Sequence, residues 1–164
     1  MRAQRLIIFF ISIVFVFGNC QKKEIEPQNY FDAVVNNSSE RLKPIEAYVD
    51  KGITEIKVGE IIDGLSRSII INVNSDKPGK YVQKYDYKTG VSMSECGLVY
   101  EIQDREDNIP KYFKSIEGNI EITEINSRKR TISGTYNFRI NSLSDNNTQN
   151  SIKGKFINIS FKKD

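Results

Sequence analysis

The residue types of this chain exclude most catalytic chemistry. Its 164 residues include no histidine, so it has no Ser-His-Asp or Cys-His machinery and no imidazole ligand for a metal. The two cysteines, Cys20 and Cys96, are too few for a cysteine-rich zinc site. The sequence contains no glycine-rich phosphate loop of the Walker or dinucleotide type. We therefore expect neither a metal nor a cofactor.

Carboxylate pairs remain open, because a glycosidase needs only two acids at a suitable separation. The densest acidic group is Asp104, Glu106 and Asp107, which lies with Arg105 in a segment typical of a hairpin loop. Such a cluster favours a solvated turn, and a calcium loop would need a Gly and a distal Glu that are missing here. We expect the protein not to be an enzyme, with a carboxylate-based hydrolase as the alternative.

Three tyrosines form a candidate binding stripe. Tyr81, Tyr85 and Tyr87 occupy odd-numbered positions, so their rings would point to one face of a strand. Such a stripe can stack on a sugar or line the mouth of a barrel that holds a small apolar ligand. The alternative is a half-exposed face of an ordinary sheet, with the hydroxyl groups reaching water.

The N-terminal segment has the order of an export signal. Arg2 and Arg5 give a positive start, and the apolar run of residues 6–17 has the length of a signal-peptide core, about 7 to 15 residues. It is too short to span a bilayer, which takes about 20 apolar residues. Cys20 follows Gly18-Asn19 at the end of this run, which resembles the lipobox of bacterial lipoproteins. The resemblance implies that Cys20 carries palmitate. An ordinary cleaved signal with an incidental cysteine, or an uncleaved anchor, would be the alternatives.

These features divide the chain into a signal peptide (1–19), a lipidated Cys20 with a flexible tether (20–29) and a β-domain (30–164). The tether is short and charged, as expected of a spacer. Its start, Gln21-Lys22-Lys23-Glu24, resembles a surface-export tag of Gram-negative lipoproteins. The resemblance implies an outer-membrane lipoprotein of the cell envelope, with the outer face favoured over the periplasmic face. We expect the membrane as a partner through the lipid. We expect no nucleic acid, because the net charge of +3 falls when the signal is removed and no basic cluster stands out.

Hydrophobic alternation predicts β-structure through the body of the chain. Over residues 131–140 one face carries only apolar residues and glycine: Ile132, Gly134, Tyr136, Phe138 and Ile140. Shorter alternations occur at 69–73, 98–102 and 120–122, with turn residues between them. The pattern predicts an all-β fold, a single antiparallel β-sandwich or a curled β-barrel-like domain. Only Ser39 to Lys51 can hold a short helix, and Pro44 argues against a long one.

Three glycines repeat a pattern in which an isoleucine stands two residues before and a large apolar residue two residues after. Gly118, Gly134 and Gly154 would then lie on the inward face, where a missing side chain makes room for a ring such as Tyr136 or Phe156 and lets a sheet curl. Scattered glycines of an ordinary β-protein are the alternative. After Phe156 the alternation changes phase, which predicts either a bulge near this residue or burial on both faces.

Several segments together resemble a family of small bacterial lipoproteins of unknown function. They are the lipoprotein signal, Phe31 to Asn36, Pro78 to Tyr81, Gly118 to Thr123, Ile132 to Phe138 and Gly154 to Phe156. The resemblance covers most of the mature domain and implies fold and location. It implies no catalytic residues.

The leading functional expectation is a lipid-anchored envelope protein, a non-enzymatic binding or accessory domain whose partner is a protein, a glycan or a small molecule. A carboxylate-based hydrolase and a lipocalin-like carrier of a small apolar ligand are the alternatives. Cys96 precedes a strand-like run, where a thiol is more often a small packed side chain than a nucleophile.

Overall fold

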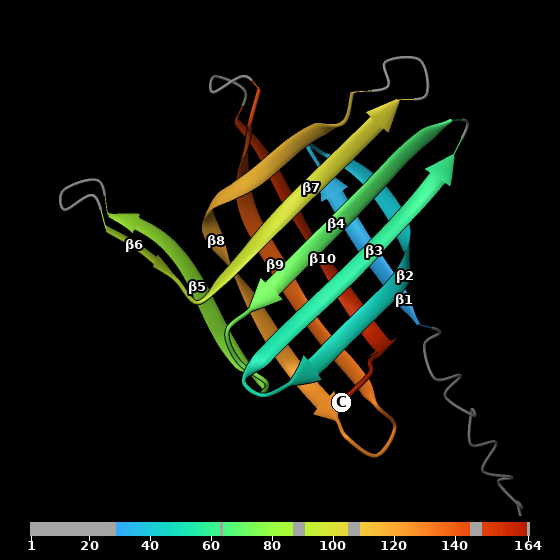
Figure 1. Ribbon diagram of the computed structural model, residues 1–164, viewed down its shortest axis with the longest axis vertical. Coiled ribbons are helices and arrows are strands. Elements are labelled where there is room, and N and C mark those ends of the chain that lie inside the picture. The colour runs from blue at the N-terminus through green and yellow to red at the C-terminus, as the bar shows by residue number, and fades with distance from the viewer. Residues whose placement is uncertain (1–28, 63, 87–90, 105–108, 145–148, 164) are drawn as a thin grey trace, which may run out of the picture.

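The computed structural model describes residues 29–62, 64–86, 91–104, 109–144 and 149–163 (Figure 1). In these ranges the chain forms β-strands and no helix, which confirms the all-β prediction. The strands are β1 (Tyr30–Val35), β2 (Ser38–Asp50), β3 (Ile53–Ile62), β4 (Leu65–Val73), β5 (Gly79–Asp86), β6 (Val91–Ser94), β7 (Cys96–Asp104), β8 (Lys111–Asn126), β9 (Thr131–Ser142) and β10 (Gln149–Ser160).

The sheet closes on itself into an antiparallel barrel. Eight strands follow one another in the order β8-β7-β4-β3-β2-β1-β10-β9, and β9 pairs back with β8 along most of its length. Of the two predicted architectures, the barrel is therefore the observed one. The β5–β6 hairpin is attached to β8 and projects from the ring, at the left of Figure 1.

β8 changes partner along one edge. Its first part pairs with β7 up to Lys114, and from Gly118 it pairs with β5. Ser115 lies at this fork: its hydroxyl oxygen accepts a hydrogen bond from Leu98 N at 2.8 Å, and its carbonyl accepts one from Gln83 Nε2 at 3.1 Å. Both bonds are buried, so one residue joins the two strands that share the edge of β8.

The interior is a packed apolar core. On β9, Tyr136, Phe138 and Ile140 are buried while Thr135 and Asn137 are exposed, which confirms the predicted face of this strand. The shorter alternations are confirmed as well, since their apolar residues are buried or pack against the core. An eight-stranded barrel is about wide enough for side chains to fill it or to hold one small ligand. Here the largest fully buried side chains fill it, and they are Phe31, Phe138, Phe156, Ile56, Ile69, Ile71, Leu98, Ile120, Ile122, Ile132, Ile140 and Ile152.

Each of the three glycines faces an aromatic ring on the neighbouring strand. Gly134 pairs with Phe156, Gly154 with Tyr136 and Gly118 with Phe138. A Cβ at Gly134 would lie 2.6 Å from Phe156 Cζ, and one at Gly118 would lie 2.6 Å from Phe138 Cδ1. The glycines therefore seat the rings, as predicted, because any side chain would occupy the space of the ring.

The phase change after Phe156 is a bulge. The register between β10 and β9 shifts between Phe156 and Ile159, and Asn158 has a φ of 52°. The extra residue lets both Phe156 and Ile159 point inward, and both are fully buried. The sequence-based prediction of a bulge near Phe156 is confirmed.

Ser39 to Lys51, the segment that the sequence left open to a short helix, holds no helix. This segment is strand β2, which pairs with β1 on one side and with β3 on the other. Pro44 lies where the β2–β3 register shifts, a position at which a strand tolerates a residue without an N–H. The strand begins directly after Asn36 and Asn37, whose positive φ angles of 48° and 72° form a tight hairpin turn with β1.

Candidate functional site

The tyrosine stripe lies on β5 only in part. The half-buried Tyr81 packs against the core, and its hydroxyl lies 2.7 Å from Ser75 Oγ and 2.8 Å from the carbonyl oxygen of Lys77. It therefore fixes the turn between β4 and β5. Tyr85 is in β5 opposite Ser92, but its side chain, like all of Tyr87 and Cys20, lies outside the described residues.

A cavity of about 520 Å³ opens at the end of the barrel where β2 and β4 begin and β3 ends. These strand ends lie at the top of Figure 1. This end of the barrel is called the mouth below. Eight of the described residues line the cavity, and they are Ser38, Ser39, Glu40, Arg41, Leu42, Glu60, Leu65 and Arg67. The volume lies in the range of about 300 to 1,000 Å³ that is usual for small-molecule sites.

Strand alternation brings charged residues to the inner side of the mouth. Glu60 follows Ile56 and Val58 on the inner face of β3, and Arg67 precedes Ile69 and Ile71 on the inner face of β4. On β2, Glu40 has the same phase as the buried Leu42. The strands thus bury apolar residues in the barrel and present charges where the barrel opens.

An ion pair joins β2 and β4 in the mouth. Arg67 Nη1 lies 2.5 Å from Glu40 Oε1, and the two side chains are 33% and 14% exposed. The second carboxylate oxygen, Oε2, is buried and has no partner in the described part of the chain. Glu40 thus holds one end of the Arg67 guanidinium, which fixes the direction of the arginine side chain.

The charge of the Glu40 carboxylate also affects the pKa values of two buried tyrosines. Burial raises the pKa of Tyr100 to about 12, and the charge of Glu40 adds to the increase while Arg67 opposes it. Burial also raises the pKa of Tyr136 far above its ordinary value, with smaller contributions from Asp32 and Glu40. Both hydroxyl groups therefore stay neutral, and neither can act as a base at neutral pH.

Glu60 is the second acid of the cavity. It is 21% exposed, and its nearest cation is the exposed Lys43, whose Nζ lies 3.8 Å from Glu60 Oε1. Glu60 is directly opposite Arg67 in the β3–β4 register. Among the described residues, no ion pair within 4.0 Å joins Glu60 to Arg67, although both line the same cavity.

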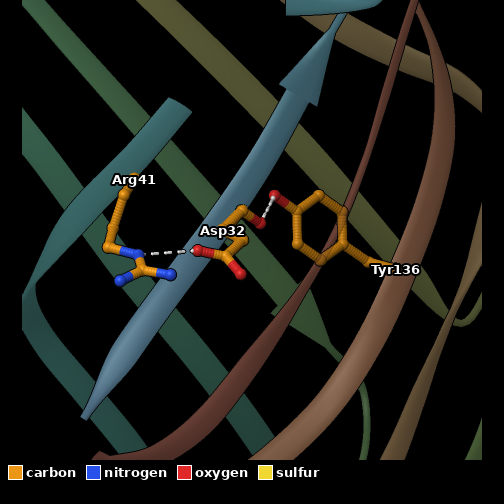
Figure 2. A network of polar contacts seen from close by, with 3 residues as sticks. All are labelled: Asp32, Arg41 and Tyr136. Atoms are coloured by element: carbon orange, nitrogen blue, oxygen red, sulfur yellow. Dashed lines mark hydrogen bonds and ion pairs between the residues drawn. The ribbon is translucent and has the colours of Figure 1, made fainter. Parts of the chain in front are cut away.

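A polar network supports β1 beside the mouth. Arg41 Nε lies 3.0 Å from Asp32 Oδ1, and the Tyr136 hydroxyl donates to the carbonyl oxygen of Asp32 at 3.1 Å (Figure 2). Arg41 belongs to β2 and Tyr136 to β9, so the network ties β1 to strands on both of its sides. The charge of Arg41 is therefore engaged by Asp32.

A second hollow of about 390 Å³ lies at the fork of β8, between β5 and β8. Its residues include Gln83, Gly118 and Asn119. The nitrogen of the Gln83 side-chain amide is already hydrogen-bonded, because Nε2 donates to the carbonyl oxygen of Ser115. Its Oε1 is buried without a partner in the described ranges. We regard this hollow as a structural part of the fork, since the buried amide of Gln83 joins β5 to β8.

Sequence reasoning missed the charged residues of the mouth. The signal lies in the alternation itself: a charged residue continues an inward apolar phase at Glu60 and at Arg67. On β4, an arginine on the same face as two buried isoleucines marks the end of the apolar core. Cys96, by contrast, is a buried free thiol as expected, and burial raises its pKa to about 11.

The fold and the cavity define a closed antiparallel β-barrel with a filled apolar interior and a polar mouth. The chain belongs to the family described as "Domain of unknown function (DUF6252)", whose model matches residues 28–160. No curated protein and no solved structure matches the chain. The resemblance to an uncharacterised family is thus confirmed, while its lipoprotein character stays a prediction. No helix long and apolar enough to cross a membrane occurs among the described residues.

Proposed function

We propose that this protein is a non-enzymatic, lipid-anchored envelope protein whose barrel binds a small polar molecule at its mouth. The observation that carries the proposal is the cavity of about 520 Å³, lined by the fixed Glu40–Arg67 pair and by Glu60. Binding pockets combine a concave shape with a few well-placed polar groups that set orientation and specificity. The mouth has both.

The lining favours a polar ligand over the apolar ligand of a lipocalin-like carrier. A ligand site at the open end of the barrel, as in a lipocalin-like carrier, suits this fold. However, Leu42 and Leu65 are the only apolar residues among the described ones that line the cavity, and the barrel interior is filled. An entirely apolar ligand would leave the charges of the mouth without solvent, which is costly.

The anchor is supported by the sequence. A signal-like segment ends at Cys20, and a short charged tether separates it from the first strand at Tyr30. Two or more acyl chains are needed for durable attachment, because each buried methylene contributes about 0.8 kcal/mol and one chain alone binds reversibly. We place the protein at the outer membrane, with the outer face favoured, on the resemblance of Gln21 to Glu24 to an export tag.

A screen of small, chemically varied fragments tests the binding proposal. The full chain, in a non-ionic detergent, would be examined by NMR through the methyl signals of Leu42 and Leu65. Ser38→Trp fills the mouth, and Thr135→Trp places the same ring on the exposed side of β9 as a matched control. We expect fragments that shift the two leucines in wild type and in the Thr135 variant, and lose that effect in the Ser38 variant. Binding that survives the filled mouth would refute the proposal.

A carboxylate-based hydrolase is the second candidate, because Glu40 and Glu60 line one cavity. It ranks lower since a cation engages each carboxylate, Arg67 for Glu40 and Lys43 for Glu60, whereas a glycosidase needs one carboxyl group that donates a proton. Nitrophenyl glycosides and esters test it. Hydrolysis that disappears in the Glu40→Gln/Glu60→Gln variant would favour the enzyme over the binding protein.

A further inference from the structure

Two opposite charges face each other in the mouth without pairing. Glu60 and Arg67 are direct partners in the antiparallel β3–β4 register, and such partners have Cβ atoms about 4.5 to 5.5 Å apart. Both side chains line the cavity. Opposite charges at this spacing normally pair, yet in the described structure Arg67 contacts Glu40 and Glu60 contacts Lys43. Both charges therefore line one cavity without a contact between them.

Most N–H donors of Arg67 have no partner among the described residues. A guanidinium has five N–H donors in a planar fork, and among the described residues Glu40 is the only partner of Arg67. One third of the side chain is exposed. The planar fork matches a carboxylate in a two-point contact, and an arginine held by a fixed acid has lost part of its freedom before the ligand arrives. The free side of Arg67 is thus suited to an anionic group.

Glu60 offers an acceptor beside it. Its contact with Lys43 is long, 3.8 Å, and Lys43 is 82% exposed, so this pair is of the weak surface type that a better-placed cation can replace. An ammonium group of a ligand would contact the carboxylate of Glu60, while the anionic group of the same ligand contacts the guanidinium of Arg67. Leu65 supplies apolar surface in the same cavity, whereas Leu42 is 2% exposed and belongs to the core.

We infer that the mouth binds a zwitterion of the α-amino acid class, with its carboxylate on Arg67, its ammonium on Glu60 and an apolar side chain against Leu65. This inference rests on the proposed function and names its ligand class. Glu40 is the positioning residue, because its Oε1 holds Arg67 while its second oxygen is buried.

L-leucine and two analogues test the inference on the full chain in a non-ionic detergent. The analogue 4-methylpentanoate lacks the ammonium, and 3-methylbutylamine lacks the carboxylate. We expect leucine to bind at least about tenfold more tightly than either analogue, since loss of one charge-assisted contact has about that effect. Titration calorimetry gives the affinities, and the Leu42 and Leu65 methyl signals give the location.

Variants separate the two contacts. Glu60→Gln should weaken leucine and the amine while leaving the acid unchanged, and Glu55→Gln, on the exposed side of the same strand, should change nothing. Arg67→Ala alone would leave Glu40 without a partner, so the paired variant Glu40→Gln/Arg67→Gln is used instead. It should weaken leucine and the acid while leaving the amine unchanged.

The results distinguish the inference from the function it rests on. If leucine binds no better than both analogues, or if Glu60→Gln leaves its affinity unchanged, the zwitterion inference is overturned. If 4-methylpentanoate alone binds in the mouth, or if only unrelated fragments do so, the inference falls and the binding function stands. If leucine binds equally to the Ser38→Trp variant, its site lies elsewhere and the inference is overturned.

Discussion

Tyr136 donates a hydrogen bond to the backbone carbonyl of Asp32 at 3.1 Å, although β10 lies between their two strands (Figure 2). The bond passes over Gly154, the residue of β10 that pairs with both Tyr136 and Ala33. A Cβ at Gly154 would collide with the carbonyl oxygen of Asp32 and lie 2.8 Å from the Tyr136 hydroxyl. The glycine and the tyrosine are thus one feature of the barrel wall.

Gly154→Ala should destabilise the protein by about 2 kcal/mol or more, because overpacking against backbone costs about 1 to 3 kcal/mol and the hydrogen bond is displaced as well. Lys153→Ala, one residue away on the exposed side, should change the free energy of unfolding by less than about 0.5 kcal/mol. Urea unfolding measures both. Equal stability of the two variants would show that the wall accommodates a side chain at this position.

Tyr136→Phe tests the contribution of the hydrogen bond to Asp32 while it keeps the aromatic ring. The ring stays stacked on Phe31, whose centroid is 5.1 Å away, and only the hydroxyl is lost. We expect a loss of about 0.5 to 1.5 kcal/mol in unfolding free energy. A loss as large as that of Gly154→Ala would mean that the hydroxyl, and not the packing at the glycine, carries the cost.

Arg67→Ala should lower the unfolding free energy by about 1 to 3 kcal/mol, because it leaves the mostly buried Glu40 carboxylate unpaired. Glu40→Gln/Arg67→Gln should cost less than the sum of the single changes, since the pair is removed as a unit. A double-mutant cycle in urea measures the coupling. Strictly additive costs would show that the pair contributes nothing.

Stability should fall at alkaline pH in part through Cys96. Burial raises the pKa of this thiol from 9.0 to about 11. A raised folded-state pKa gives stability that is fully present below pH 9.0 and is lost as the pH rises through about 11. The unfolding midpoint of Cys96→Ala should therefore fall less steeply over this range than that of wild type. The buried tyrosines are present in both proteins and affect both slopes equally. Identical slopes would therefore contradict the assignment to the thiol.

Cys20→Ser should release the protein from membranes and abolish its labelling with a fatty acid. Cys96→Ser serves as the control, because the buried Cys96 cannot carry a membrane-inserted acyl chain. Fractionation and fatty-acid labelling measure both variants. Unchanged labelling of the Cys20 variant would remove the anchor from the proposed function.

The tyrosine stripe remains a prediction for two of its three members. Replacing Tyr85 and Tyr87 by Ala should abolish binding of a glycan or other stacked ligand and change stability by less than about 0.5 kcal/mol if the rings are exposed. Packed rings would cost about 3 to 5 kcal/mol each. Thermal unfolding distinguishes these cases, and Tyr81→Phe, which loses only the bonds to Ser75 and Lys77, gives the cost of a structural tyrosine in the same strand.

Local alternation predicted the strands and the faces of β9 and β10, because a period of two is written in adjacent residues such as Tyr136 and Phe138. Closure of the barrel could not be predicted, since it depends on pairing between β8 and β9 along their whole length and on the fork at Ser115. The site was missed for a related reason. Glu40 lies in the segment that the sequence left open to a short helix, so its inward phase and its approach to Arg67, a contact across 27 positions, could not be derived.

The direction of β1 sets the orientation of the proposed site. This strand starts at Tyr30 and runs to Val35, and the turn after it delivers Ser38 directly to the mouth. Six residues of extended chain span about 20 Å, so the chain enters the barrel at Tyr30, about this distance from the mouth. If Cys20 holds the chain to a bilayer, the chain enters the barrel at the end of β1 that is farther from the cavity, so the cavity stays open to solutes while the protein is anchored.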